Sequence, residues 1–546
     1  MEGQADLALV GGSVLTMDRE GPRAQAVAVR AGRTVAVGSD DDIRPLVGRK
    51  TRLISLQGQT VVPGFQDSHI HAPQGGLRRE QCDLGDLPGK EAYLQAIQRY
   101  AATHDEPWIV GGGWALDHFP RGTPHRLDLD AVVPDRPAFL KNRDGHGAWV
   151  NSKALETAGV TRDTPDPSDG RIERDENGVP LGTLHEGAMD LVERLIPQID
   201  KTRWERAILG AQSYLHSLGI TAWQDAWATP DTEAAYRSLA EQRRLTARVR
   251  LALWWERDRG LEQVEDLFDR RRDNTIGRIV AGSVKIMQDG VPENFTAGMI
   301  DPYLGDDGKP SDRRGLSFVE PSLLNEAVIR LDREGFQVHV HAIGDRAARE
   351  ALDSFEGAHR ANGRRDARHH IAHLQVVHPG DVPRFARLGV VANAQALWAC
   401  YDDQMRDLCV PYLGPERTSW QYPFGSLVRH GARLAMGSDW PVTTPEPMAQ
   451  IEVGVTRIPT EARDRDPLNA RERIDLETAL HAFTAGSAFV NFLDDETGSI
   501  EEGKLADIVV LDRDVMAPDA TPIGEAKAVL TLVDGEPVHA DASIGW

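Results

Sequence analysis

Two histidines separated by one residue are the first feature of this sequence that could do chemistry. His69 and His71 follow an apolar run, residues 61–65, that ends in Pro-Gly-Phe. Alternate residues of a β-strand point to the same side, so we expect both imidazoles to project together from a strand end. Neutral imidazole is a ligand for zinc and its first-row neighbours. Two ordinary surface histidines would show the same spacing, so the metal interpretation depends on further ligands.

Four later strand-like segments end in residues that can bind or bridge a metal ion. They contribute Lys285, His341, His373 and Asp439. If these strands belong to one barrel, their carboxyl ends converge, and distance in sequence is no obstacle. His339 competes with His341, and His369 and His370 compete with His373. In each case we prefer the histidine nearer the strand end.

Lys285 lies between apolar residues on its strand, where an isolated ammonium group is costly to bury. Desolvation and nearby cations lower the pKa of such an amine. A neutral amine can take up carbon dioxide and become a carbamate, an anionic ligand with two oxygens. We therefore predict a divalent metal, with zinc as first choice, bound as one or two ions, and a carboxylated Lys285 as the bridge. The alternative is that Lys285 pairs with Asp289 beside a single ion.

Asp439 ends the last apolar strand-like run, in a Gly-Ser-Asp-Trp sequence. A carboxylate that touches an activated water can take its proton and later pass it to a leaving group. Ser-Asp is also a common helix cap, but the position at a strand end favours catalysis. We predict Asp439 as metal ligand and catalytic residue.

Several polar residues outside this set could contact a substrate. His146 lies in a glycine-flanked turn, residues 144–147, and Glu186 could reach the metal or begin a helix. Asp289 and Asn294 follow the lysine strand. Trp114 is retained as a candidate contact, although its pattern favours the core, as does that of Trp149.

The elements that must position these residues alternate between strand-like and amphipathic helical segments. Eight strand-like segments with helices between them favour a closed (β/α)8 barrel over an open doubly wound sheet, because no glycine-rich phosphate loop occurs. After the His-x-His strand, the segments are residues 219–223, 249–253, 282–287, 336–341, 370–374, 389–393 and 433–437.

The two ends of the chain read as short strands with glycine turns. Each end alone is too small to bury a core, so we predict one composite β-sandwich from residues 1–60 and 492–546. The barrel is expected over residues 61–74 and 181–491. The long gap after the first barrel strand predicts an α/β insertion, residues 75–180, over the active site.

Composition narrows the class of protein. The net charge of −22 gives no basic face for nucleic acid, and no apolar run is long enough to cross a bilayer. Three cysteines without zinc-ribbon spacing, and an N-terminus without a signal-peptide pattern, favour a reduced cytoplasm. We therefore expect a cytoplasmic protein that acts on a small molecule and has no nucleic-acid or membrane partner.

Taken together, these motifs resemble the amidohydrolase superfamily, in its amidohydrolase-3, YtcJ-like branch, which includes N-substituted formamide deformylases. The resemblance covers nearly the whole chain. The sequence departs from the family pattern at residues 293–298, where members often have Gly-x-Arg-Thr-Ala. This change lies near the expected mouth of the barrel, so it bears on the choice of substrate. The matching stretches are residues 62–71, 145–155, 284–290, 341–347, 370–375, 437–442 and 498–511.

The resemblance implies that the six residues from His69 to Asp439 form a metal site in a TIM barrel, and that a homodimer can form. It implies hydrolysis of a non-peptide carbon–nitrogen bond, in an N-substituted formamide or N-acyl amine, by attack of metal-activated hydroxide on the carbonyl. Two alternatives stay open: an ester, lactone or carbamate hydrolase on the same site, and a non-catalytic binding or regulatory protein that retains the fold.

Overall fold

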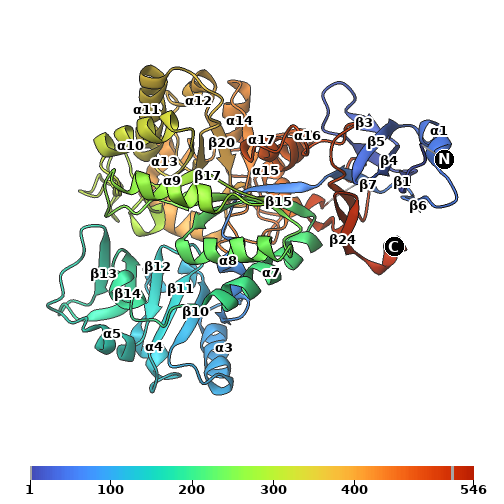
Figure 1. Cartoon of the computed structure of the whole chain (residues 1–546). Coiled ribbons are helices and arrows are strands. Elements are labelled where there is room, and N and C mark those ends of the chain that lie inside the picture. The colour runs from blue at the N-terminus through green and yellow to red at the C-terminus, as the bar shows by residue number, and fades with distance from the viewer. Residues whose placement is uncertain (1–2, 86, 518–521) are drawn as a thin grey trace.

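A barrel of eight parallel strands forms the centre of the computed structural model, which describes residues 3–85, 87–517 and 522–546 (Figure 1). The Asp439 amide donates to His69 O at 2.8 Å, and the His71 amide to Trp440 O at 2.8 Å, so the first and last strands meet. The predicted (β/α)8 barrel is confirmed. In spatial order its strands are β8 (Phe65–Ile70), β15 (Ile220–Ala228), β16 (Arg248–Trp254), β17 (Ile279–Met287), β18 (Gln337–Ala342), β19 (His370–His373), β20 (Val391–Ala394) and β21 (Leu434–Met436).

Helices surround the barrel, several of them through one apolar stripe. In α10 (Pro321–Arg333), Leu324, Ala327, Val328 and Leu331 are buried and follow helical spacing. In the described chain, twelve α-helices follow the insertion. Besides α10 they are α6 (Asp190–Glu193), α7 (Lys201–Ser217), α8 (Pro230–Glu241), α9 (Gln263–Asp273), α11 (Asp345–Asn362), α12 (Val382–Leu388), α13 (Val410–Thr418), α14 (Phe424–Arg429), α15 (Pro447–Thr456), α16 (Leu476–His481) and α17 (Ser487–Val490).

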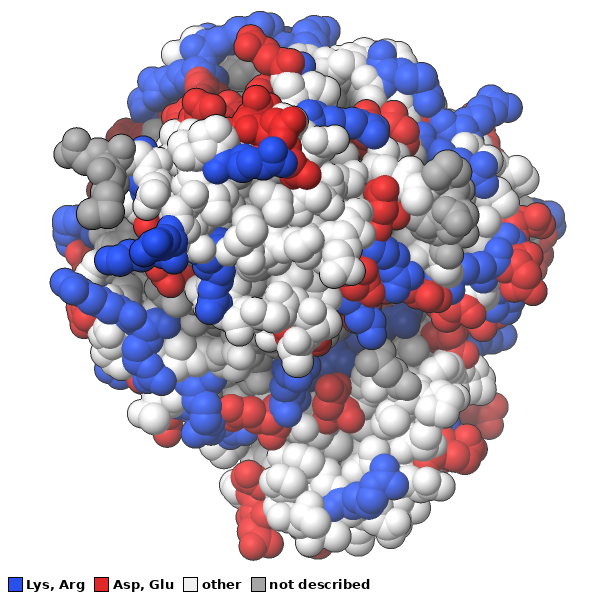
Figure 2. Space-filling model, turned by 90° about the vertical axis from the view of Figure 1, so that its right-hand side faces the viewer, with Lys and Arg blue, Asp and Glu red and all other residues white. Residues whose placement is uncertain are grey.

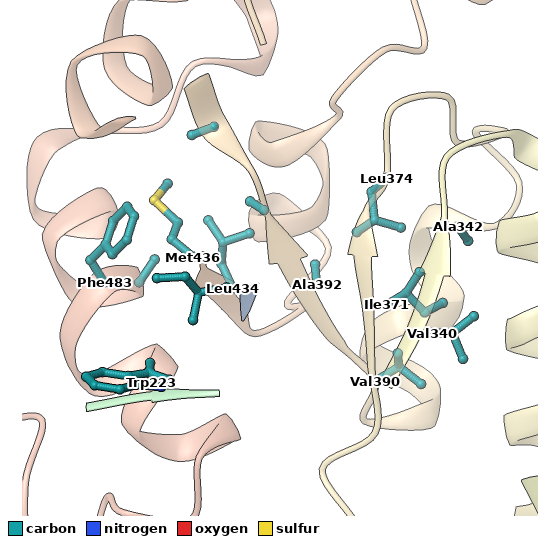
Figure 3. Close-up of a cluster of buried hydrophobic side chains, with 14 of the residues drawn as sticks. Trp223, Val340, Ala342, Ile371, Leu374, Val390, Ala392, Leu434, Met436 and Phe483 are labelled. Carbon is teal, nitrogen blue, oxygen red and sulfur yellow. The ribbon is translucent and has the colours of Figure 1, made fainter. Parts of the chain in front are cut away.

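Alternation along the strands separates the core from the polar barrel interior. On β18, Val338, Val340 and Ala342 belong to the main hydrophobic cluster, whereas His339 and His341 point the other way. Figure 3 shows the same outward packing on β19 and β21, where Leu434 and Met436 meet Phe483 of the helical segment Ala482–Gly486. Residues two apart on a strand therefore share a face, which brings the functional side chains together.

Both ends of the chain build one sandwich, at the right of Figure 1. The C-terminal strand β22 (Ile508–Leu511) pairs antiparallel with β7 (Thr60–Pro63), and Leu9, Val61 and Val510 share one buried cluster. The composite sandwich is thus confirmed as part of the fold. One sheet is β5-β4-β1-β6 and the other β24-β23-β22-β7-β2-β3; the further bounds are β1 (Leu7–Val10), β2 (Ser13–Leu15), β3 (Arg23–Ala24), β4 (Ala26–Arg30), β5 (Arg33–Gly38), β6 (Arg52–Ser55), β23 (Ala528–Val533) and β24 (Glu536–Ala540).

The apolar run before the histidines is two strands rather than one. Residues 60–63 form β7 in the sandwich, and the barrel begins with Phe65, after Gly64. An added Cβ at Gly64 would lie 2.4 Å from Thr221 Oγ1, so the chain passes closely over β15 here. The expected boundary between residues 60 and 61 therefore falls inside β7 and is placed too early.

A six-stranded mixed sheet lies below the barrel in Figure 1 and forms the predicted insertion. Its last strand, β14, pairs antiparallel with β12 and β13 and runs to Glu186, so the expected boundary at residue 180 is also too early. The elements are β9 (Cys82–Asp83), β10 (Ile109–Trp114), β11 (Ala138–Asn142), β12 (Gly147–Val150), β13 (Gly170–Arg174), β14 (Pro180–Glu186), α3 (Lys90–Thr103), α4 (Arg126–Asp130) and α5 (Ser152–Ala158).

The surface gives two further observations. On the face shown in Figure 2, acidic and basic side chains are interspersed around an area with little charge. Among the described residues, no helix combines the length and the apolar character needed to cross a membrane.

Candidate metal centre

Three of the predicted ligands meet at the carboxyl end of the barrel. Asp439 Oδ1 lies 3.1 Å from His69 Nε2 and 2.9 Å from His71 Nε2. His69 and Asp439 are buried, and His71 is partly exposed. Their ligand atoms lie within 4.8 Å of one another, a separation that one ion can span. The convergence follows from the barrel, since β8 and β21 are neighbours that close it.

The remaining predicted residues surround this group. The His373 ring lies 4.7 Å from the His69 ring and 4.4 Å from the His341 ring, measured between centroids. Burial, followed by the positive charge of Lys285, lowers the pKa of His69 and of His341 well below the usual range. Both rings are therefore neutral and present lone pairs. The barrel thus brings all four histidines to one mouth, together with Asp439 and the buried Lys285.

Unpartnered polar atoms test whether this group suits a metal ion. Among the described residues, His69 Nε2, His373 Nδ1 and Asp439 Oδ1 are buried without a hydrogen-bond partner. Leaving such atoms unsatisfied costs about 1–3 kcal/mol each. Imidazole nitrogens and a carboxylate oxygen are also the ligand types that zinc prefers. The donor set therefore fits a divalent metal ion.

The backbone at two of these residues is held in a left-handed conformation. His373 has φ 78° and Asp439 has φ 58°, although neither is glycine. Conformations of this kind cost about 1–3 kcal/mol each and persist where surrounding contacts impose them. Here the His373 amide donates to Gln395 Oε1 at 2.7 Å, and Asp67, to which the motif alone assigns no role, accepts from the amides of His69 and Ser438. These hydrogen bonds thus hold the backbone in the conformation that points His373 and Asp439 toward the centre.

Gly437 allows β21 to approach β8 closely enough for Asp439 to reach the histidines. A Cβ at this position would lie 2.5 Å from His69 N and 2.7 Å from His69 Cβ. We expect Gly437→Ala to lower the free energy of unfolding by about 1–3 kcal/mol, as overpacking does, and to reduce bound metal. Denaturant unfolding and metal analysis measure both effects. Gly210→Ala, whose Cβ would meet no atom within 4 Å, is the matched control, and equal behaviour of the two variants would contradict the close approach.

Lys285 is buried beside this group, and burial lowers its pKa to about 8. The alternative pairing with Asp289 is not what the structure shows. Asp289 accepts from the amides of Ile343 and Gly344, at 3.0 and 2.8 Å, and contacts His341 Nδ1 at 3.2 Å. Asp289 therefore orients His341 and is not the partner of Lys285.

A histidine–glutamate pair from the insertion lies beside the mouth. His146 Nδ1 is 2.9 Å from Glu186 Oε1, and the His146 ring is 5.6 Å from the His341 ring. Burial opposes protonation, but the charge of Glu186 raises the pKa of His146 to about 9. Thr296 and Asn294 also donate to Glu186 Oε1, at 2.9 and 3.3 Å. The insertion thus supplies a protonated imidazole whose Nε2 is free of this pairing.

A cavity of about 130 Å³ opens next to the centre. Trp398 lines it and stacks on the His373 ring at 5.1 Å between centroids, which joins the cavity to the metal ligands. Its charged lining residues are Arg143, Asp144, Glu293, Asp402 and Glu461. Burial raises the pKa of Glu293 and of Asp402.

Three predicted substrate contacts have other roles. Trp114 is completely buried in the insertion core, where its Nε1 donates to Leu140 O, so that candidate is wrong. Asp289 is completely buried and holds His341, and Asn294 supports Glu186. The sequence gives the residue types at these positions but does not determine which neighbour each side chain contacts.

The competing histidines are engaged elsewhere. His339 Nε2 contacts His69 Nδ1 at 2.8 Å from deeper in the barrel, and His370 Nε2 contacts Gln224. His369 lies against Asp332 and stacks on Phe355. Trp398 at the cavity wall could have been found only from a pattern of aromatic residues after β20, which is too common to be specific.

Comparison with known proteins shows the family to which the chain belongs. The chain is 32% identical to the protein LONG AFTER FAR-RED 3 of Arabidopsis thaliana, over 98% of this chain and 92% of the relative. It is 28% identical to the N-substituted formamide deformylase of Arthrobacter pascens, over 97% of each. The crystal structure of a metal-dependent hydrolase from Pyrococcus horikoshii matches with a TM-score of 0.73 and 25% identity, over 94% of this chain and 98% of that one. Because the model of the amidohydrolase family matches residues 52–539, this chain belongs to that family.

Proposed function

We propose that the protein is a metal-dependent hydrolase of non-peptide carbon–nitrogen bonds, acting on an N-substituted formamide or another N-acyl amine. The observation that carries this proposal is the meeting of His69, His71 and Asp439, with unpartnered ligand atoms, at the mouth of the barrel. The similarity to an N-substituted formamide deformylase, which covers 97% of each chain, supports the choice of a carbon–nitrogen bond.

His69, His71, His341, His373 and Asp439 would hold one or two divalent ions, with zinc preferred for this donor set. A bound ion of this kind lowers the pKa of water and polarises a carbonyl oxygen. Lys285, as a carbamate, would add two oxygen ligands. With a pKa of about 8, roughly a tenth of the amine is neutral at pH 7, far more than for an exposed lysine, and the neutral amine is the form that takes up carbon dioxide.

Asp439 is the group that moves the proton. Burial would raise the pKa of its carboxyl, but the neighbouring His71 and His373 lower it, so the group starts as an anion. In the proposed reaction Asp439 takes a proton from the attacking water and delivers it to the departing nitrogen. The hydrogen bond from its own amide to His69 O keeps this carboxylate over the histidines.

His146 is the donor that faces charge developing on the carbonyl oxygen. Glu186 holds its Nδ1 and maintains its proton, which leaves Nε2–H for the substrate. Removing one donor of this type costs about 10²–10³-fold in kcat. We expect His146→Asn to lower kcat by that factor while bound metal stays at the wild-type level.

Steady-state kinetics and metal analysis of the same preparation measure both quantities. His118→Asn is the matched control, because His118 also lies in the insertion but contacts Tyr93. An unchanged kcat in His146→Asn would remove this residue from the reaction.

A panel of substrates tests the proposal. N-formyl and N-acetyl amines are compared with esters, lactones and carbamates of matched size, using zinc-loaded protein and detection of the released acid. We expect the amides to have the higher kcat/KM. Four carboxylates against one guanidinium line the cavity, so among the amides we expect those with a cationic amine portion to exceed neutral isosteres.

Faster turnover of esters, lactones or carbamates would replace the carbon–nitrogen assignment by the corresponding hydrolase. Failure of the purified protein to bind stoichiometric metal would instead favour a binding or regulatory protein on the same fold.

A further inference from the structure

Below the metal centre, the barrel interior contains a connected row of polar side chains. The row starts at Gln337, the first residue of β18, and ends at His69, and all its members are buried. Its members are Gln337, Gln224, His339, His370 and His69. Because each link has a donor and an acceptor, the position of every hydrogen can be worked out from one end.

The fixed end of the row is Gln337. Its Nε2 lies 2.8 Å from Arg368 O and 2.8 Å from Val490 O, and backbone carbonyls can only accept. The amide nitrogen of Gln337 therefore points to these carbonyls. Its Oε1 is left for Gln224 Nε2, which donates to it at 3.0 Å.

The orientation of Gln224 follows from that donation. Its Oε1 faces His339 Nδ1 at 2.8 Å and His370 Nε2 at 3.1 Å, and a carbonyl oxygen accepts both. His339 must therefore carry its hydrogen on Nδ1. His339 is completely buried among other imidazoles and, within the part of the chain that the structure describes, contacts no carboxylate. A charged ring would therefore be costly, so its Nε2 carries a lone pair and no hydrogen.

His69 is the next residue in the row. His339 Nε2 lies 2.8 Å from His69 Nδ1, so the hydrogen on this link belongs to His69 Nδ1. His69 Nε2 is then left without a hydrogen, and this is the atom that lies 3.1 Å from Asp439 Oδ1. We propose that the row from Gln337 to His339 fixes His69 in the tautomer that presents Nε2 to a metal ion, which makes His339 and Gln224 positioning residues.

A second branch extends to the other side of the centre. Asn393 Nδ2 donates to His370 Nδ1 at 3.1 Å, and Asn393 Oδ1 accepts from Gln395 Nε2 at 3.0 Å. Gln395 Oε1 accepts from the His373 amide at 2.7 Å. Hydrogen bonds therefore connect the backbone of His373, through this branch and the row, to the carbonyls of Arg368 and Val490. Partners of this kind orient a ligand, and their loss typically costs 10–100-fold in metal affinity.

The experiment compares two variants of His339 in the full chain. His339→Gln can place an oxygen toward His69 and an amide nitrogen toward Gln224, which preserves the direction of the row. His339→Leu removes both links. Zinc affinity is measured by competition with a chelator, and we expect roughly a 10–100-fold loss for the leucine variant and a much smaller loss for the glutamine variant.

His216→Leu is the matched control, since His216 is also buried with both ring nitrogens in contact, but with Ile220 O and Thr246 Oγ1. We expect it to bind zinc as the wild type does. Gln224→Leu breaks the row one link earlier and serves if His339→Leu does not fold. Wild-type affinity in the folded leucine variants, or equal losses for glutamine and leucine at position 339, would overturn the proposal.

The inference rests on the proposed metal function, and the measurement separates the two. Absence of stoichiometric zinc in the wild type would contradict the proposed function. Tight zinc binding by the wild type and by His339→Leu alike would contradict only the row. Nitrogen NMR of labelled histidines in the zinc-loaded protein adds a direct readout, because it distinguishes a ring protonated at Nδ1 from one protonated at Nε2.

Discussion

Asp439→Asn is expected to reduce turnover by roughly 10²–10⁴-fold, the usual range for loss of a positioned acid–base group. Asparagine keeps the shape of the side chain and an oxygen near His69 and His71, which lie 3.1 and 2.9 Å from Asp439 Oδ1. It cannot take a proton from water. Bound metal should therefore stay near the wild-type level while kcat falls.

The measurement combines kcat on the best substrate of the panel with metal analysis and a thermal unfolding curve. Asp332→Asn is the matched control, because Asp332 is a buried carboxylate that contacts a histidine, His369, outside the barrel mouth. Turnover retained by Asp439→Asn would contradict the proton-transfer role. Loss of metal together with turnover would show instead that Asp439 acts chiefly as a ligand.

Lys285→Met is the second change with a large expected effect. Burial lowers the pKa of Lys285 to about 8, and Asp439 is the charge that opposes this shift. If the amine is carboxylated, the variant loses two oxygen ligands. We then expect bound metal to fall from two ions to one or fewer and turnover to fall by roughly 10²–10³-fold, comparable to loss of another group that stabilises transition-state charge.

Metal analysis, kcat and incorporation of labelled bicarbonate into the wild type provide the readouts. Lys141→Met is the control, since Lys141 belongs to the insertion, where it pairs with Glu193 at 2.7 Å. Unchanged metal content in Lys285→Met, with no label in the wild type, would favour a single ion beside an uncarboxylated lysine.

The barrel, and the meeting of the candidate ligands at its mouth, could be predicted because they depend on short-range patterns. A period of two places His339 and His341 on one face and Val338 and Val340 on the other, whatever surrounds the strand. Strand ends then identify His341 and Asp439, because parallel strands in a barrel present their carboxyl ends at one mouth. The barrel and the positions of the candidate ligands on its strands therefore follow from local sequence.

The hydrogen-bond partners of the polar side chains around the site could not be predicted, since they depend on contacts between distant segments. Glu186 lies at the end of an insertion strand, and only the folded sheet places its Oε1 next to His146. Asp289 follows the lysine strand, and its position in the sequence is also compatible with pairing to Lys285. In the structure it accepts hydrogen bonds from the backbone amides of Ile343 and Gly344, just after β18. The division of residues 60–70 between two domains could not be predicted either, because the apolar run 61–65 continues from β7 into β8 with only Gly64 between the two strands.

The composite sandwich has a consequence for how the chain is made. Val515 donates its amide to Thr60 Oγ1 across 455 residues, so β7 stays without its neighbour β22 until nearly the whole barrel has been synthesised. At about 5–20 residues per second this interval lasts roughly 20–90 s on the ribosome. During that time an apolar strand edge is uncovered, and such edges are where nascent chains associate wrongly. A long exposure of this edge during translation is thus a consequence of building one domain from two distant parts of the sequence.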